Sequence, residues 1–386
     1  MIVLKNARLV SYLTEDCPLE TADIVIDGKE ISGIYPTGTD FGDCEKVDLA
    51  GKTVLPGMID LHMHLHFDTM DSHLKKPYEY IISGISYAEE FLRQGFTTIR
   101  SCGEPYGVGF AVRQAERQGI VKAPRIFTSG GFISPTARGG EGPGTRFADG
   151  AAELQKACRE EYAEGADFLK YMGTGSVASE AGEPGALICS REEMFTLQSM
   201  AEALGTYAAV HCHGKSGIML CAEAGIRTIE HVSNIDDECI ELILKKGGKS
   251  AIIPTLGPIG LLRGGMFKNA AIAKKAGAQP VKKHKMLDAS RAGILTGWGT
   301  DVSQDYYTEN PGSEFALRSE RGYTNQEILQ QATINSAKII GLEDRLGTVK
   351  VGKLADLIVV DGKPDEDISV MYKHPYAVYK EGQRYF

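Results

Sequence analysis

Hydrophobic residues along the chain gather in short runs, and each run is followed by a stretch in which apolar residues recur with helical spacing. Short apolar runs predict buried strands, and the stretches between them predict amphipathic helices. The candidate strands are residues 57–62, 96–100, 125–129, 167–172, 207–211, 228–231, 250–254 and 294–297. The candidate helices are residues 87–94, 153–164, 192–204, 217–224, 238–246 and 281–291. Alternating strands and helices indicate an α/β fold with a parallel sheet, and eight such units between residues 56 and 345 predict a (β/α)8 TIM barrel.

Two helices in the second half of the chain carry an N-terminal start signal. In the segments Ser190–Glu193 and Thr324–Glu327, a hydroxyl residue is followed three positions later by glutamate. This spacing is typical of a capping box, in which each side chain satisfies a backbone N–H of the other residue. We therefore expect helices to begin at these two places.

The two ends of the chain have a different pattern, with short β runs and turn signals instead of long helices. The β runs are residues 1–4, 7–9, 24–34, 356–360 and 377–380, with turn signals at Asp27-Gly28 and, for a hairpin, at Asp361-Gly362. Neither end is long enough to bury a core by itself. We predict that residues 1–55 and 346–386 form one composite β-sandwich, with the metal-dependent barrel of residues 56–345 inserted between them.

Residues that can bind metal ions stand at the ends of five candidate strands. They are His62, His64, Lys170, His211, His213, His231 and Asp301. Alternate residues leave a strand on the same face, and neutral imidazole binds Zn²⁺ well. The carboxyl ends of barrel strands form the catalytic face of that fold. A single His-x-His pair also fits a buried, hydrogen-bonded pair, but five such strand ends together predict a shared metal site.

Composition narrows the class of partner. The formal net charge is −9, which argues against a nucleic-acid binder or a basic membrane-surface protein. No apolar run approaches the roughly 18–20 residues that span a bilayer, and the apolar start is too short for a signal peptide. The 8 cysteines lack CxxC pairing and fit reduced thiols. We expect a cytoplasmic protein that acts on a small molecule and, because barrels of this size often self-associate, forms a homo-oligomer.

The motifs that close the candidate strands resemble those of the amidohydrolase superfamily. They are the segment Gly57–His64 (GMIDLHMH), Lys170 on the fourth strand, His211, His231 and the segment Gly299–Asp301 (GTD). The tail from Leu346 to Asp361 looks like the return of that superfamily into its β-sandwich. The likeness covers nearly the whole chain. It is greatest to the branch that includes imidazolonepropionase, Xaa-Pro and arginine dipeptidases, and ochratoxin-type amidases.

This resemblance implies two divalent metal ions, typically zinc, with His62 and His64 on one ion and His211 and His231 on the other. It implies further that Lys170 is carboxylated to a carbamate that bridges the ions. The chemistry agrees, because an ammonium has no lone pair for a cation, whereas the neutral amine favoured by burial can react with CO₂. The alternative is a lysine that bonds a carboxylate at the barrel rim.

Asp301 is then the expected proton shuttle as well as a metal ligand. It would accept a proton from a metal-bridging hydroxide as this attacks a carbonyl, and return the proton to the leaving amine. His213 is a second catalytic candidate, which faces the pocket either beside the ligands or against the substrate. The role of His66 stays open in the same way.

Substrate contacts are expected from loops that follow the strands. Arg138 and Arg146, in a Gly-rich loop, are candidates to bind a substrate carboxylate, although solvated loop arginines are as compatible with the pattern. Tyr306 and Asn310 are further candidates. Relatives carry histidines in the loop of Arg138 and after Asp301 that this chain lacks, so the substrate does not transfer simply from any one of them.

Together these features predict a binuclear metal-dependent amidohydrolase that splits a dipeptide or an N-acyl amino acid. The alternatives are hydrolysis of a cyclic amide (lactam) and deamination of a heterocycle. Deamination is disfavoured because single-metal deaminases usually lack the strand-four lysine. A non-catalytic metal-binding scaffold is the remaining alternative, and it conflicts with the complete set of catalytic residues.

Overall fold

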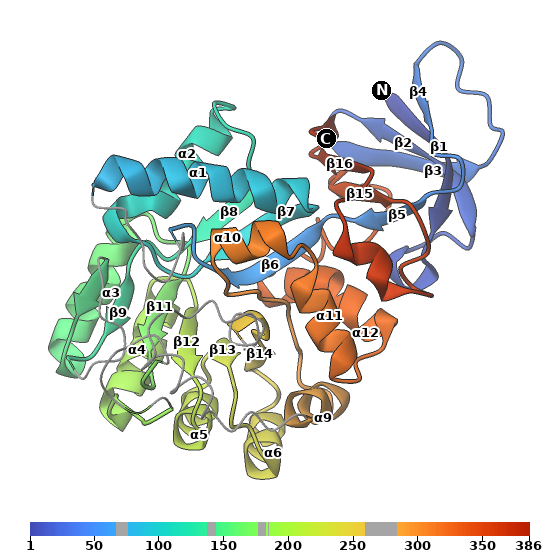
Figure 1. The fold of residues 1–386 in the computed structure, drawn as a ribbon. Helices are drawn as coiled ribbons and strands as arrows, with labels where there is room; N and C mark the ends of the chain where they lie inside the picture. Colours follow the sequence, from blue (N-terminus) through green and yellow to red (C-terminus); the bar gives the residue numbers. More distant parts are fainter. Residues whose placement is uncertain (67–75, 137–143, 177–182, 184, 259–283) are drawn as a thin grey trace.

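The computed structural model describes residues 1–66, 76–136, 144–176, 183, 185–258 and 284–386. The chain is α/β, with a central body of parallel strands and helices and a smaller, mostly antiparallel sheet beside it (Figure 1). Both chain ends lie in the smaller sheet, where the first strands and the last strands run side by side. Among the residues described, no helix is both long enough and apolar enough to cross a membrane.

The smaller sheet has eight strands, in the order β17-β16-β15-β5-β1-β2-β3, with β4 paired to β1. Their bounds are β1 (Ile2–Leu9), β2 (Thr21–Asp27), β3 (Glu30–Pro36), β4 (Glu45–Asp48), β5 (Thr53–Pro56), β15 (Leu357–Val360), β16 (Ala377–Lys380) and β17 (Gln383–Arg384). The antiparallel pairing of β5 with β15 joins the two ends of the chain, with Leu55 opposite Ile358. These strands form one continuous hydrogen-bonded sheet. Whether it folds over into the two layers of a sandwich stays a prediction.

In its described residues, the central body holds nine strands in two parallel sheets. A three-stranded sheet consists of β6 (Met58–Met63), β7 (Phe96–Ser101) and β8 (Arg125–Thr128), in that order. A six-stranded sheet has the order β10-β9-β11-β12-β13-β14. Its members are β9 (Phe132–Ser134), β10 (Thr145–Phe147), β11 (Leu169–Met172), β12 (Ala208–Cys212), β13 (Thr228–His231) and β14 (Ala251–Ile253).

Backbone hydrogen bonds connect the two parallel sheets. On one side, the amide of Asp167 donates to the carbonyl of Thr128 at the end of β8 (2.8 Å). On the other side, the chain near Trp298 lies between β14 and β6, since Gly297 N–H donates to the Ile252 carbonyl and Leu61 N–H to the Trp298 carbonyl. The carboxyl ends of the parallel strands therefore gather at one end of the body.

Helices cover the outside of these sheets, as Figure 1 shows for α1 to α6. Their bounds are α1 (Pro77–Arg93), α2 (Val108–Arg117), α3 (Gly150–Glu164), α4 (Arg191–Ala203), α5 (Lys215–Ala224), α6 (Asp237–Lys245), α9 (Lys285–Arg291), α10 (Gln304–Glu309), α11 (Ser313–Glu320), α12 (Asn325–Gln330) and α13 (Ser336–Ile339). Short 3-10 segments are η1 (Ser11–Leu13) between β1 and β2, η2 (Pro105–Gly107) before α2, and η4 (Ile368–Tyr372) between β15 and β16, while the π-helical η3 (Gln331–Asn335) joins α12 to α13. Both predicted capping boxes are confirmed: Ser190 and Thr324 each accept from the N–H of the glutamate three residues on.

Several local predictions were wrong. The predicted strand at 294–297 makes only single bridges, Ile252 to Thr296 and Thr255 to Gly299. Because a Cβ on Gly299 would lie 2.7 Å from the Cβ of His62, this segment passes β6 too closely for an ordinary side chain. The predicted breaks within residues 1–9 are absent, since β1 continues through a bulge between Leu4 and Ala7.

Other differences concern lengths and turns. The helix predicted at 87–94 begins already at Pro77, which suits a first helical turn because its missing N–H needs no partner there. The Asp361-Gly362 pair does not close a tight hairpin: β15 and β16 pair, but the chain between them includes η4. The short strands β9 and β10 had no period-two signal strong enough to predict them.

The smaller sheet is attached to the amino end of β8 by a set of ion pairs that runs from the buried Asp356 out to the exposed Lys29. Arg125, the first residue of β8, donates to Asp356 and to Glu381 at 2.9 Å each, and Lys29 also pairs with Glu381. Burial by itself would raise the pKa of Glu381, but the hydrogen bonds from Lys29 and Arg125 outweigh it and lower that pKa to about 2. The ionised carboxylate therefore stabilises the folded chain.

We expect this contribution to disappear in acid. A carboxyl group with a depressed pKa in the folded state stabilises above its unfolded value of 4.5, and the effect is lost as the pH falls from there toward about 2. Urea unfolding of the wild type and Glu381→Gln should show a stability difference at pH 7 that shrinks steadily below pH 4.5. A difference that is constant with pH would contradict the assigned ion pairs.

Candidate metal centre

His62 and His64 stand at the carboxyl end of β6, a strand that is buried along its whole length. β6 is held by β7 on one side and by the chain around residue 300 on the other, where the Thr300 and Asp301 amides both donate to the His62 carbonyl (3.1 and 2.9 Å). The two imidazole rings are 5.5 Å apart between centroids. The strand thus fixes both rings beside Asp301.

The hydrogen-bond partners of these rings determine which nitrogen carries the proton. His62 Nδ1 lies 2.6 Å from a Glu230 carboxylate oxygen, and His64 Nδ1 lies 2.9 Å from the Gly103 carbonyl oxygen. A carboxylate and a carbonyl only accept hydrogen bonds, so both histidines donate through Nδ1. Burial lowers the pKa of both rings to about 4, which keeps them neutral at pH 7. Each Nε2 atom therefore presents a lone pair.

These lone pairs converge on the carboxylate of Asp301. Its Oδ1 lies 3.9 Å from Nε2 of His62 and 3.5 Å from Nε2 of His64. Three electron-pair donors that face one another without a proton between them need a cation. Imidazole nitrogen and carboxylate oxygen are also the ligands that divalent ions of the zinc type prefer. The residues present therefore fit a divalent metal ion at this position.

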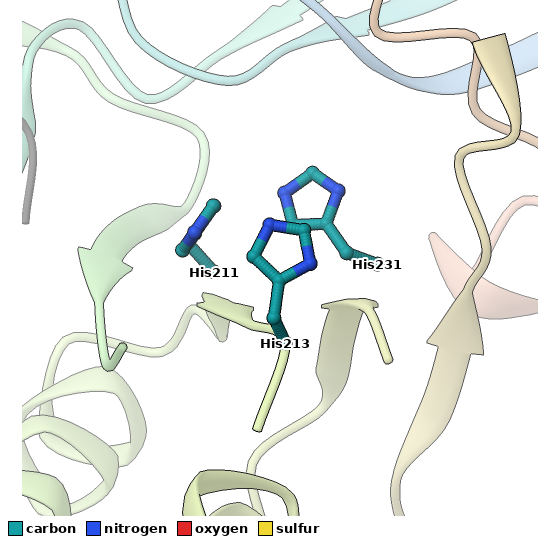
Figure 2. A group of neighbouring side chains, drawn as sticks. All are labelled: His211, His213 and His231. Carbon is teal, nitrogen blue, oxygen red and sulfur yellow. The ribbon is translucent and has the colours of Figure 1, made fainter. Parts of the chain in front are cut away.

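A second group of potential ligands lies at the ends of the neighbouring strands β12 and β13. Figure 2 shows the rings of His211, His213 and His231 gathered together above these strand ends. The ring of His231 is 4.5 Å from that of His211, 4.6 Å from that of His213 and 4.7 Å from that of His62. Register places His211 beside Glu230 and Cys212 beside His231. Adjacent parallel strands thus bring the second group up against the first.

The second group also fits a cation. His211 Nε2 is buried and has no hydrogen-bond partner among the described residues, and burial holds the pKa of His211 and of His231 well below the usual histidine value. His213 Nδ1 contacts the Ser233 hydroxyl at 2.8 Å, and His231 Nδ1 contacts the Thr255 hydroxyl at 2.6 Å. The carboxylate of Asp301 approaches this group as well, 3.8 Å from His231 Nδ1.

Lys170, on β11, has a buried amine with no hydrogen-bond partner among the described residues. The side chain is 3% exposed. A positive charge on this amine would lower the pKa of five surrounding histidines, His62, His64, His211, His213 and His231. An unpartnered buried ammonium beside so many nitrogen donors is costly, and carboxylation would replace its positive charge with a negative one.

Backbone strain is concentrated at the same strand ends. Asp301, His231 and Val232 adopt positive φ angles of 52°, 70° and 44°, a region that non-glycine residues rarely occupy. Each such residue costs of order 1–3 kcal/mol and persists only where its surroundings require it. The side chains of two of these residues, His231 and Asp301, lie 3.8 Å apart.

The other candidates from the sequence lie in varied surroundings. Arg146 is bonded to three glutamates of α3, Glu160, Glu161 and Glu164, by contacts of 2.7 to 3.2 Å. Tyr306 is buried in the core around α1, and the exposed Asn310 bonds the Tyr306 carbonyl at the end of α10. His66 lies beyond His64, with ring centroids 5.8 Å apart. Arg138 lies outside the described residues.

The sequence interpretation missed the residues that hold the histidine rings. Glu230 and the fully buried Arg100 lie beneath His62, while Ser233 and Thr255 contact His213 and His231. A signal was present for the first two, because both are charged residues inside segments predicted as strands of the central body, residues 96–100 and 228–231. A charged residue at a buried strand position needs a partner of opposite charge, and here Arg100 and Glu230 pair with each other.

The fold and this site define an α/β protein with a candidate metal centre at the ends of its parallel strands, and comparison with known proteins identifies the family. The sequence profile of the amidohydrolase family matches residues 53–384, so the chain belongs to that family. The superfamily resemblance drawn from the motifs is thereby confirmed. Membership makes the chain an amidohydrolase-superfamily hydrolase that acts on small molecules, in a family that generally uses divalent metal ions. It also implies a TIM barrel with a small accompanying domain.

Individual relatives span most of the chain. Ochratoxinase of Aspergillus niger is 29% identical over 365 residues, which cover 84% of this chain and 73% of that protein. Imidazolonepropionase of Symbiobacterium thermophilum is 26% identical over 410 residues, covering 93% and 83%. The crystal structure of a Xaa-Pro dipeptidase with methionine bound in its active site superposes with a TM-score of 0.89 at 29% identity, covering 100% of this chain and 99% of that one.

We expect divalent ions to stabilise the folded protein. A ligand that binds only the native state adds about 2.7 kcal/mol when its free concentration is 100 times Kd. Zinc added to chelator-treated protein should therefore raise Tm, and His211→Gln should reduce that rise. The matched control is His284→Gln, since His284 is exposed and caps no helix through its side chain. An unchanged Tm for the wild type would contradict the site.

Proposed function

We propose that the protein is a binuclear metal-dependent hydrolase that cleaves the amide bond of a dipeptide or an N-acyl amino acid. The observation that carries the proposal is the convergence of the His62 and His64 lone pairs on Asp301, beside the His211–His213–His231 group and the unpartnered Lys170 amine. In this proposal the strands of the central body close into a (β/α)8 barrel around the site.

The family resemblance and the contacts together give the proposed ligands. His62, His64 and Asp301 would hold one ion, and His211 and His231 would hold the other. Lys170, once carboxylated to a carbamate, would supply an anionic ligand to the site. When bound, such ions polarise a substrate carbonyl and lower the pKa of a water molecule so that it can act as a nucleophile at neutral pH.

The chain's own residues then move the proton. Asp301 presents Oδ1 toward His62 and His64 and Oδ2 toward His231, so its carboxylate stands at the meeting point of both groups. It takes the proton of the attacking water as the C–O bond forms, and it gives that proton to the amine nitrogen as the C–N bond breaks. The Asp301 amide donates to the His62 carbonyl (2.9 Å), which fixes the backbone that carries this carboxylate.

His213 is the second catalytic candidate. Its ring stacks on that of His231 with an interplanar angle of 19°, and the Ser233 hydroxyl fixes its Nδ1 edge. Nε2 is thereby directed away from Ser233. This placement suits a donor that meets negative charge as it develops on the carbonyl oxygen.

Support for amide chemistry comes from the relatives. Ochratoxinase and the Xaa-Pro dipeptidase, at 29% identity each, are similar over nearly the full chain. The similarity to imidazolonepropionase leaves ring-amide hydrolysis as the second candidate.

The decisive experiment is a mass-spectrometric screen of zinc-loaded protein against dipeptides, N-acyl amino acids, lactams and amino-heterocycles, with a chelator-treated control. We expect metal-dependent cleavage of linear amides. Lys170→Ala should lose this activity together with bound metal, whereas Lys156→Ala, at an exposed position, should retain both. Ring opening alone would establish the second candidate, and full activity of Lys170→Ala would contradict the carbamate.

A second variant tests Asp301, which is proposed both as a metal ligand and as the proton shuttle. Asp301→Asn removes the proton acceptor, and loss of such a group costs typically 100- to 10,000-fold in rate. We expect kcat at saturating zinc to fall by at least about 100-fold, with metal content measured in parallel. Asp305→Asn, four residues further on an exposed turn of α10, serves as the control. A kcat within about tenfold of the wild type would exclude Asp301 as the shuttle.

A further inference from the structure

A fully buried arginine–glutamate pair lies beneath the metal centre. Arg100 on β7 and Glu230 on β13 are both 0% exposed, and Arg100 Nη2 donates to Glu230 Oε1 at 2.8 Å. The two residues belong to different sheets, so the pair crosses the interior of the body. A buried ion pair of this kind contributes little net stability, because desolvation offsets its attraction. Its position beneath the metal centre indicates a role other than stabilising the fold.

Each oxygen of the Glu230 carboxylate has its own partners. Oε1 accepts from the guanidinium of Arg100 and from the hydroxyl of Thr228 (2.6 Å). Oε2 accepts from Nδ1 of His62 (2.6 Å). Arg100 also donates through Nη1 to Thr228 and through Nε to the carbonyl of Leu61, the residue before His62. Arg100 therefore fixes both the carboxylate and the strand that carries the imidazole.

We propose that Arg100 and Glu230 are positioning residues that set the tautomer of His62, so that its Nε2 lone pair faces Asp301 and is available to a metal ion. The inference rests on the metal site of the proposed function and goes beyond its ligands. Since Glu230 and His231 are consecutive in β13, the same strand holds His62 through a side chain and supplies a ligand to the second group. The pair thus also fixes the two groups relative to each other.

The proposal makes a specific prediction for Glu230→Gln, which keeps the shape of the side chain. Arg100 offers only donors, so the amide oxygen of glutamine must take the place of Oε1. The amide NH₂ then faces His62 Nδ1, which has to become an acceptor. The ring proton moves to Nε2, toward Asp301, and His62 can no longer ligate.

The double variant Arg100→Met/Glu230→Gln should reverse this effect. Without the guanidinium, the glutamine amide is free to turn its oxygen to His62 and its NH₂ to the Thr228 hydroxyl. The His62 tautomer of the wild type is then restored. A purely structural role for the ion pair predicts no such change in the position of the ring proton.

The experiment measures zinc affinity by chelator competition and the histidine tautomers by ¹⁵N NMR of protein labelled at histidine. The resonance of His62 is identified by its absence in His62→Gln. We expect two zinc equivalents in the wild type, one of them bound about 10- to 100-fold more weakly in Glu230→Gln, and recovery in the double variant. Asp356→Asn is the matched control: Asp356 is also buried and paired with an arginine, Arg125, but at the amino end of β8. It should bind zinc like the wild type.

Several results would overturn the inference. If Glu230→Gln binds zinc with wild-type affinity and its His62 keeps the proton on Nδ1, the inference is wrong, while the proposed function stays intact. An equal loss of zinc affinity in the single and the double variant would show that the Arg100–Glu230 pair only supports the fold. If Glu230→Gln does not fold, the ¹⁵N NMR spectrum of the metal-free wild type decides the question. A proton on Nε2 of His62 in that spectrum would contradict the inference. A wild type that binds no zinc would overturn both this inference and the proposed function.

Discussion

Five neutral imidazole rings are packed together at the strand ends, those of His62, His64, His211, His213 and His231. The arrangement of the surrounding chain depends on keeping these rings neutral. Burial lowers the pKa of each ring, since an imidazolium so far from water and so near its neighbours is unfavourable. Neutral rings still need a partner for Nδ1. Four of the five rings meet that need through Gly103, Glu230, Ser233 and Thr255, of which Glu230 lies in β13 and the other three lie outside the named strands.

The fold supplies these partners through the geometry of parallel strands. Successive strands end at the same edge, so residues distant in the chain, such as those of β6 and β13, become neighbours. Gly57 lies between β5, which belongs to the smaller sheet, and β6, which belongs to the central body. A Cβ at this position would lie 2.2 Å from the Thr97 hydroxyl. A residue with a side chain would push β6, and with it His62, away from β7. The position of the candidate metal centre therefore depends on how the smaller sheet joins the central body at Gly57.

Much of this arrangement could be predicted from the sequence, because periodicity and capping are local. The strand of residues 228–231 and the helix start at Ser190 were predicted at their observed positions. Contacts between distant residues were not accessible in the same way. A Gly-rich loop made Arg146 a reasonable candidate for a substrate carboxylate, yet the acidic side of α3 meets its guanidinium. Glu230 and Arg100 could be recognised as unusual, but their pairing across two sheets depends on the closed tertiary arrangement.

The two ligand groups differ in how firmly their protons are placed. His62 and His64 bond to a carboxylate and a carbonyl, which accept only, so their tautomers are fixed. His213 and His231 bond to hydroxyl groups of Ser233 and Thr255, which can donate or accept. A hydroxyl rotates when the ring proton moves from one nitrogen to the other, and the contact survives. His62 and His64 therefore have partners that fix the ring proton, whereas His231 and His213 have partners that can adapt. For His213, the ring proposed to meet changing charge, an adaptable partner allows the ring proton to move while the contact is kept.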